Sequence, residues 1–178
     1  MAAFFIWFLI IQGVLFAAEL SMPVQQALII PFTELIATVS AGCIQLFDPQ
    51  VVAQGILIKN AETGFAVVIK AGCNGVEATI ILVAALVAFP RVSWWYKLTG
   101  VLVGFFTIQL LNLLRIISLF YLGQWSMEAF EWAHLYLWPA LIMLDVLLVF
   151  LIWLSIWDKR RKTLAGSEED DGNQAVTL

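Results

Sequence analysis

Long apolar runs recur along this chain, and they constrain its fold more than any other feature. The first run, AFFIWFLIIQGVLFAA, covers residues 3–18, and further runs cover residues 76–89, 98–121 and 135–157. Such runs suit helices that cross the roughly 30 Å of hydrocarbon in a bilayer. The hydrophobic fraction of 62% exceeds the roughly one half that is usual for soluble domains. We therefore expect an all-α polytopic membrane protein with about four transmembrane helices.

The segment 24–47 is more polar than these runs. It carries glutamine, threonine, serine and glutamate side chains, and also Pro31, among its apolar residues. This mixture is typical of an amphipathic helix that lies along a membrane surface, and we expect it on the outer face. A fifth transmembrane span is the alternative that the composition leaves open.

Residues 51–70 have the pattern of β-structure rather than that of a span. The β-prone runs GILIKN and FAVVIKAG are separated by the short turn-like stretch Ala-Glu-Thr-Gly. The charges of Lys59, Glu62 and Lys70 keep this segment out of the hydrocarbon. We expect a short β-hairpin outside the bilayer that leads the chain directly to Cys73.

The distribution of lysine and arginine orients the spans. These residues concentrate on cytoplasmic flanks, which places the connector 91–97 and the basic cluster 159–162 inside. The connector 123–133 contains no lysine or arginine, and we expect it outside together with the hairpin. Both termini are then cytoplasmic. Residues 1–158 are expected to form one membrane-embedded domain, and residues 159–178, first basic and then acidic, a disordered cytoplasmic tail.

Several classes of protein lack support in the sequence. No basic stretch with interleaved aromatic residues indicates nucleic-acid binding. One histidine and two separated cysteines do not make a metal site, and no P-loop or dinucleotide motif predicts a cofactor. The N-terminus lacks the charged region and the cleavage site of a removable signal peptide, so we interpret the first apolar run as a retained span.

Three chemically distinctive residues fall at about the same depth under this topology. Cys73 precedes the second span, Arg115 lies near the outer end of the third, and His134 opens the last. A thiol, a guanidinium and an imidazole, each from a separate helix, therefore converge near the outer leaflet. We expect them to share one pocket.

The stretch AGCNG around Cys73 favours a reactive thiol. Gly72 and Gly75 leave the backbone room to turn, and a helix that starts near Val76 would direct its free N–H groups towards the sulfur. A helix N-terminus lowers the pKa of a thiol, and its N–H groups can also stabilise a developing oxyanion. Two alternatives stay open: a buried, inert cysteine, and a structural disulfide with Cys43.

Arg115 and His134 each have a functional and a structural interpretation. Arginine is costly inside an apolar helix. Asn112, three residues earlier, lies on the same helical face, and we expect it and Glu77 to orient the guanidinium. The structural alternative is an arginine that snorkels to the headgroups. His134 lies among tryptophans and a tyrosine, and its structural alternative is a place in an interfacial aromatic belt.

A cysteine, a histidine and a cation together suffice for acyl transfer. The thiolate attacks a carbonyl carbon, the imidazolium protonates the leaving amine, and the arginine stabilises the oxyanion or orients the substrate. The alternative from another class is a non-catalytic scaffold or transporter subunit, in which Arg115, Asn112 and Glu77 form a structural polar cluster. A rhomboid-like serine protease has less support, because the chain has no Gly-x-Ser-x-Gly motif and no second histidine.

The order of these motifs resembles the exosortase/archaeosortase family. The resemblance rests on AGCNG opening one span, NLLRI late in the next and a single histidine opening the last, and it covers roughly residues 25–155. The residue pattern of GCNGVEATIILVAALVAFP and NLLRIISLFYLG looks most like that of the exosortase H subgroup. The resemblance implies a cysteine protease and transpeptidase of the Gram-negative inner membrane whose active site faces the periplasm. Its substrates would be exported proteins with a C-terminal sorting signal, made of a short motif, a transmembrane helix and a basic tail.

The resemblance also implies roles for individual residues. Cys73 would be the nucleophile, Arg115 the substrate-orienting or oxyanion-stabilising cation, and His134 the general acid and base. Asn74 stands where many members have serine, which leaves these three residues intact. We group Asn74 with Asn112 and Glu77 as supporting residues. No cofactor is implied, and the acceptor in the envelope is a nucleophile that the sequence does not identify.

Overall fold

The computed structural model describes residues 2–176, with side chains described from 3 to 163. It is mostly helical, which confirms the expected class, and it also contains a small three-stranded sheet. The elements in chain order are α1 (Ala2–Glu19), α2 (Met22–Val24), the π-helical turn η1 (Gln25–Ile29), α3 (Ile30–Gln45), β1 (Val51–Gln54), β2 (Leu57–Asn60), β3 (Ala66–Val68), α4 (Val76–Ala88), α5 (Trp94–Trp125), α6 (Met127–Trp132), the π-helical turn η2 (Ala133–Leu137) and α7 (Trp138–Val176).

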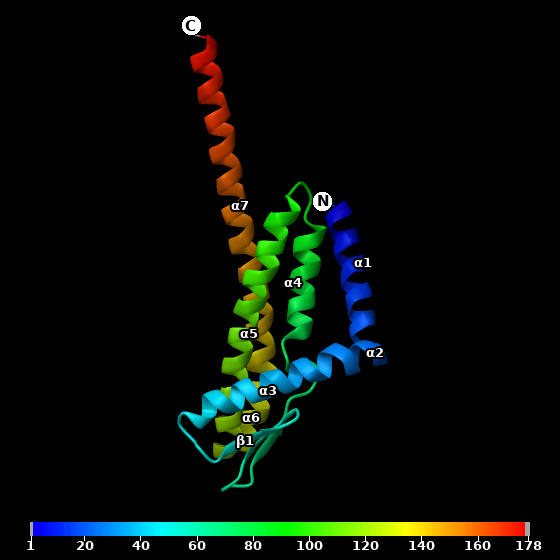
Figure 1. The fold of residues 1–178 in the computed structure, drawn as a ribbon, viewed down its shortest axis with the longest axis vertical. Helices are drawn as coiled ribbons and strands as arrows, with labels where there is room; N and C mark the ends of the chain where they lie inside the picture. Colours follow the sequence, from blue (N-terminus) through cyan, green and yellow to red (C-terminus); the bar gives the residue numbers. More distant parts are fainter. Residues whose placement is uncertain (1, 177–178) are drawn as a thin grey trace.

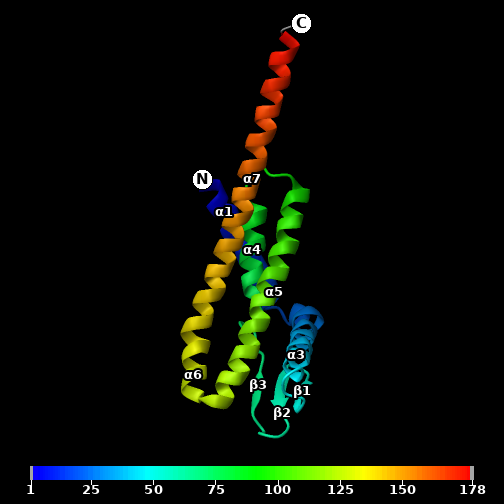
Figure 2. The same cartoon turned by 90° about the vertical axis from the view of Figure 1, so that its left-hand side faces the viewer.

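The helices form an elongated bundle with one helix across its end. The helices α1, α4, α5 and α7 run roughly alongside one another, whereas α3 crosses the end at which α4 begins (Figure 1). The sheet lies at this same end, next to α3 and near α6 (Figure 2). The chain therefore brings its extended strands and its crossing helix together at one end of the bundle.

Three helical segments of the described chain are long and apolar enough to cross a membrane, namely Met22–Gln45, Trp94–Trp125 and Met127–Thr163. Ala3–Glu19 and Val76–Ala88 are apolar but shorter. Met22–Gln45 contains α3, so the segment expected to lie flat qualifies as a span by composition, yet it runs across the other helices (Figure 1). The topology of four spans and one surface helix stays a prediction.

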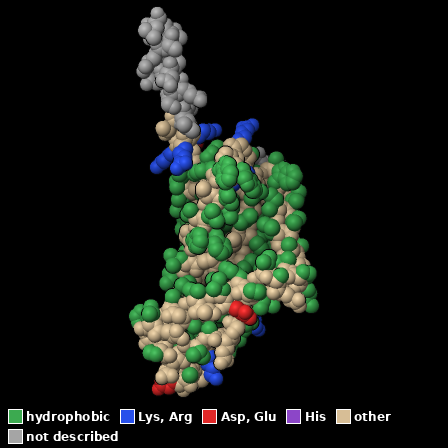
Figure 3. All heavy atoms as spheres, viewed as in Figure 1, with side chains coloured by type: hydrophobic (Ala, Val, Ile, Leu, Met, Phe, Trp, Pro, Cys, Tyr) green, Lys and Arg blue, Asp and Glu red, His purple; other side chains and the backbone are tan. Residues whose placement is uncertain are grey.

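The outer surface of the bundle is apolar. Figure 3 shows hydrophobic side chains over the bundle, lysine and arginine at the end from which α7 emerges, and both signs of charge at the sheet end. Phe106, Leu110 and Leu148 are among the large apolar side chains that are exposed. Soluble monomers rarely expose a continuous apolar patch of this kind. The surface therefore suits lipid around the bundle.

The sheet contains an antiparallel hairpin and one further strand. β2 pairs antiparallel with β3, and the strands are joined by residues 61–65. β1 pairs antiparallel with the other side of β2, a strand that the sequence pattern did not predict. It is held by α3, since Gln45 Nε2 donates a hydrogen bond to Val51 O at 2.7 Å. Tertiary contact with α3 thus stabilises a strand of only four residues.

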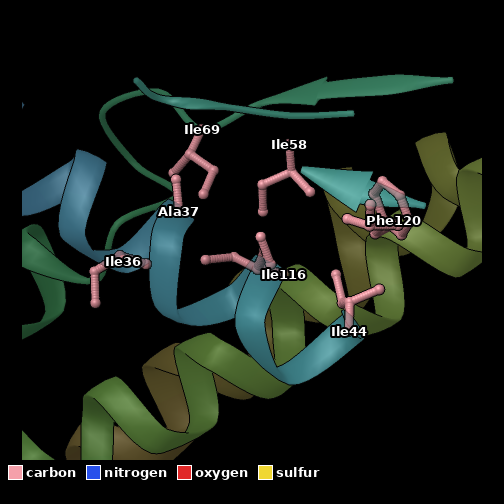
Figure 4. Close-up of a cluster of buried hydrophobic side chains, with 9 residues drawn as sticks. Ile36, Ala37, Ile44, Ile58, Ile69, Ile116 and Phe120 are labelled. Carbon is pink, nitrogen blue, oxygen red and sulfur yellow. The ribbon is translucent and has the colours of Figure 1, made fainter. Parts of the chain in front are cut away.

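One hydrophobic core joins α3, the sheet and α5 (Figure 4). The buried residues of α3 recur three or four positions apart, as expected for a helix with one buried face. The core comprises Ile36, Ala37, Ala41, Ile44, Val51, Ile58, Ile69, Ile116 and Phe120. Because Ile69 lies just after β3 and Ile116 just after Arg115, this core seats the cysteine loop next to the arginine.

The helix α7 continues past the bundle to Val176. Asp158 forms ion pairs with Lys162 at 2.7 Å and with Arg161 at 3.6 Å, and pairs at this spacing support an exposed helix. The last part of α7 belongs to the segment 159–178, for which the sequence predicts a disordered tail. Residues 177–178 lie outside the described chain, and the disorder of the tail stays a prediction.

Candidate active site

Cys73 lies in the loop that joins β3 to α4. Its N–H donates a hydrogen bond to Lys70 O at 2.9 Å. Gly72 and Gly75 have φ values of 83° and 76°, in the left-handed region that glycine adopts without steric cost. The backbone therefore turns on both sides of the cysteine, as the glycines predict, and the loop presents the thiol just before α4.

Arg115 binds this loop from α5. The side chain is only 4% exposed. Its Nη1 donates a hydrogen bond to Gly72 O at 3.0 Å, and its Nη2 donates one to Cys73 Sγ at 3.5 Å. The guanidinium therefore points into the protein rather than snorkelling to the headgroups, and it holds the cysteine loop against α5.

The structure corrects the expected partners of Arg115. Among the described residues, neither Asn112 nor Glu77 forms a hydrogen bond or ion pair with the guanidinium. Asn112 is fully buried, and neither atom of its amide has a partner there. Glu77 lines a second cavity of about 220 Å³ together with Gly72 and Arg115. Helical spacing predicts a shared face, but it does not determine which way a long side chain extends.

The structure also corrects the expected direction of the thiol pKa. Burial raises the pKa of Cys73 above its ordinary value, and the nearby Arg115 charge opposes this only in part. At the start of α4, the N–H of Val76 donates to Asn74 Oδ1 at 3.1 Å rather than to the sulfur. The side chain of Asn74 thus satisfies a helix N–H that the sequence interpretation directed at the sulfur.

One cavity of about 330 Å³ brings the three predicted residues together. Cys73 reaches it from the loop, Arg115 from α5 and His134 from η2. Residues 65–71, which include β3, line it as well. The remaining lining residues are Ile116, Leu119, Met127 and Phe130. A thiol, a cation and an imidazole therefore meet in a cavity whose other side chains are mainly apolar.

The π-helical turn η2 positions His134 at this cavity. Pro139 lacks an N–H, so the regular helical hydrogen bond to the carbonyl four residues earlier is missing. The N–H of Trp138, the residue before this proline, donates to Ala133 O, five residues back, as in a π-helix. The His134 ring stacks on Phe130 with centroids 5.6 Å apart. Its Nδ1 is buried and has no hydrogen-bond partner within the described chain, which leaves it available to a bound molecule.

Asn74 links the cysteine loop to α3. It is fully buried, and its Nδ2 donates a hydrogen bond to Thr33 Oγ1 at 3.0 Å. Thr33 in turn donates to Ile29 O at 2.7 Å. Sequence reasoning did not single out Thr33, because a threonine in a polar helix segment carries no distinguishing local signal.

Gln109 is the second residue that sequence reasoning missed. Its amide lies against Gly75, where an added Cβ would come within 2.8 Å of Nε2. Both amide atoms are buried without a partner in the described chain. Gln109 lies three residues before Asn112, which lies three before Arg115, so extending the polar stripe by one turn would have found it.

The two cysteines are free thiols in the structure. Cys43 lies in α3 and Cys73 in the loop before α4. The disulfide alternative is therefore not realised here. Cys73 lines the cavity, and its sulfur accepts a hydrogen bond from Arg115. A free thiol beside a guanidinium, with an imidazole lining the same cavity, has the groups that acyl transfer needs.

Comparison with protein families identifies a family for this chain. The family model described as Transmembrane exosortase (Exosortase_EpsH) matches residues 2–152. The match covers the cysteine loop, α5 and the helix that carries His134. Comparisons with curated proteins and with solved structures give no match. The family predicted from the motif order is confirmed: the chain belongs to the transmembrane exosortase family.

Proposed function

We propose that this exosortase is a membrane cysteine transpeptidase that cleaves C-terminal sorting signals and transfers the cleaved protein to an acceptor in the envelope. The observation that carries the proposal is the guanidinium of Arg115 bound to Cys73 Sγ in a cavity that His134 also lines. The substrates are exported proteins that end in a short motif, a transmembrane helix and a basic tail. Membership of the exosortase family supports this substrate class.

The reaction follows from the three side chains. His134 takes the proton of the Cys73 thiol as the sulfur attacks the scissile carbonyl carbon, and Arg115 donates hydrogen bonds to the oxyanion. The imidazolium then gives its proton to the leaving amine as the C–N bond breaks, and a thioester remains on the sulfur. Attack by the acceptor on the thioester carbonyl releases the product and restores the thiol.

The proposed setting is the Gram-negative inner membrane, with the cavity facing the periplasm and both termini in the cytoplasm. In this arrangement α1, α4, α5 and α7 cross the bilayer and α3 lies along the outer face. The basic side chains at the end of the bundle opposite the sheet support it, because such residues flank spans on the cytoplasmic side (Figure 3).

A trapped thioester tests the proposed reaction. The probe is an exported reporter protein that carries a C-terminal signal from the same genome, incubated with purified enzyme. We expect intact-mass measurement to find the enzyme with the cleaved reporter attached at Cys73, and hydroxylamine to release it, because thioesters react readily with this nucleophile. Cleavage of the reporter with no hydroxylamine-labile adduct at any time point would overturn the thioester route.

The raised pKa of Cys73 predicts the pH dependence of its alkylation. Burial disfavours the thiolate, so the rate with iodoacetamide should rise with a midpoint above about 8.5, the pKa of a free cysteine. Arg115→Gln should move the midpoint higher still, because the Arg115 charge lowers the thiol pKa. The measurement uses Cys43→Ser protein, so that one thiol reacts. A wild-type midpoint at or below that of free cysteine would contradict the dominance of burial.

A further inference from the structure

One edge of the sheet is free, and it runs along the cavity of Cys73. The strand order is β1-β2-β3, so β3 has a neighbour on one side only. Seven consecutive residues, 65–71, line the cavity and are followed by Cys73. In Figure 2, β3 lies between β2 and the helices α5 and α6. The free edge of β3 therefore leads directly to the thiol.

The hydrogen-bond pattern identifies the backbone groups at this edge. Phe65 O accepts a hydrogen bond from β2, and Ile69 N–H donates one to the carbonyl just before β2, each at 2.9 Å. The backbone groups of an antiparallel strand point alternately to its two sides. The N–H and C=O of Ala66 and Val68 consequently point away from β2. No hydrogen bond within the described chain reaches these four groups.

The opposite edge of the sheet is covered by the protein itself at Val51. Val51 O of β1 accepts a hydrogen bond from Gln45 at 2.7 Å, and Val51 N–H donates to Asp48 O at 3.3 Å. Val51 is also fully buried in the core that α3 shares with the sheet. No residue of β1 lines the cavity, whereas the unpaired backbone groups of Ala66 and Val68 lie beside the candidate nucleophile.

We infer that the substrate binds as a fourth strand of this sheet. The residues just before its scissile bond lie extended along β3 and exchange backbone hydrogen bonds with Ala66 and Val68. This inference rests on the proposed function, which supplies a polypeptide substrate. An extended peptide is the ligand that alternating N–H and C=O groups match, because it presents the complementary alternation. At roughly 3.3 Å per residue, residues 66–70 accommodate about five substrate residues.

The substrate strand runs parallel to β3. The chain passes from β3 through Cys73 into α4, and so from the sheet into the bundle (Figure 2). A substrate that continues from its cleaved motif into a transmembrane helix enters the membrane in the same direction. An antiparallel strand would send that helix away from the bundle.

Proline substitution tests whether the edge at β3, and not the edge at β1, binds the substrate. Val68→Pro removes an N–H from the free edge of β3 and leaves the hydrogen bonds of the neighbouring residues to β2. Its matched control is Ala53→Pro, which removes an N–H from the outer side of β1, since Ala53 alternates with residues that face β2. We expect Val68→Pro to lower kcat/KM for the signal-bearing reporter about tenfold or more, mainly through KM, and Ala53→Pro to change it less than about threefold.

Hydrogen exchange on a complex of inactive enzyme and reporter tests the inference even if Val68→Pro misfolds. Cys73→Ala protein bound to the uncleaved reporter should show slower exchange in residues 65–70, carried by the amides of Ala66 and Val68, and unchanged exchange in residues 51–54. Unchanged exchange in 65–70, or wild-type cleavage by folded Val68→Pro, would reject strand addition while the proposed function stands. Normal cleavage by Cys73→Ala would instead reject the proposed function.

Single-cysteine cross-linking tests the direction of the substrate strand. Cysteine is placed at Ala66 or at Val68 in protein that lacks both native cysteines, and the reporter carries one cysteine at successive positions before the scissile bond. Parallel pairing requires Val68→Cys to cross-link nearer the scissile bond than Ala66→Cys. The reverse order would overturn the parallel arrangement.

Discussion

Substitution of Cys73 by alanine is expected to abolish processing of signal-bearing proteins, with a loss of about a thousandfold or more in kcat/KM. Alanine has no nucleophile, and neither Arg115 nor His134 can form the acyl intermediate in its place. The protein should still insert and fold, because Cys73 is only half-buried at the edge of the core and alanine removes a single sulfur atom. The measurement is the ratio of full-length to cleaved reporter in membranes, with purified enzyme giving the rate.

Cys43→Ala is the matched control for this substitution. Cys43 is also a free thiol, but it lies on α3 and does not line the cavity. We expect it to process the reporter at the wild-type rate. Wild-type processing by Cys73→Ala protein of normal abundance would reject the assignment of the nucleophile, and with it the transpeptidase proposal.

Arg115→Ala should lower kcat by about a hundredfold to a thousandfold, the cost of removing one oxyanion donor in well-studied acyl-transfer enzymes. The substitution also removes the hydrogen bond from Arg115 to Gly72 O, so the cysteine loop loses an anchor to α5. We therefore expect a lower thermal midpoint as well as a lower rate. Reporter cleavage and thermal unfolding in detergent measure the two effects separately.

Arg115→Lys separates charge from geometry. Lysine keeps the positive charge but cannot donate two hydrogen bonds from a planar fork, as Arg115 does to Gly72 O and Cys73 Sγ. We expect an intermediate kcat and an alkylation profile for Cys73 close to that of the wild type. Arg91→Ala is the control, since Arg91 is exposed in the connector before α5. Equal kcat values for Arg115→Ala and wild type would leave Arg115 with no part in the reaction.

The candidate site was predictable as a set of residues but not as a network of contacts. Cys73, Arg115 and His134 stand out in the sequence because each is a reactive or costly group next to an apolar run, and the structure brings them to one cavity. The hydrogen bonds that hold the site together could not be predicted, because they join residues far apart in the chain. Asn74 binds Thr33, 41 residues away, and the fork of Arg115 binds Gly72 O, 43 residues away.

The sequence by itself determined the class of fold and the local elements, because apolar run length, charge asymmetry and glycine positions act within a few residues of one another. It also determined the β-prone stretch and the motif order by which the family is recognised. Only the tertiary structure decided that β1 joins the sheet and that the edge of β3 stays free. It also decided that burial outweighs the arginine in setting the pKa of Cys73. These outcomes depend on which distant segments come into contact and exclude water, and no local pattern encodes that.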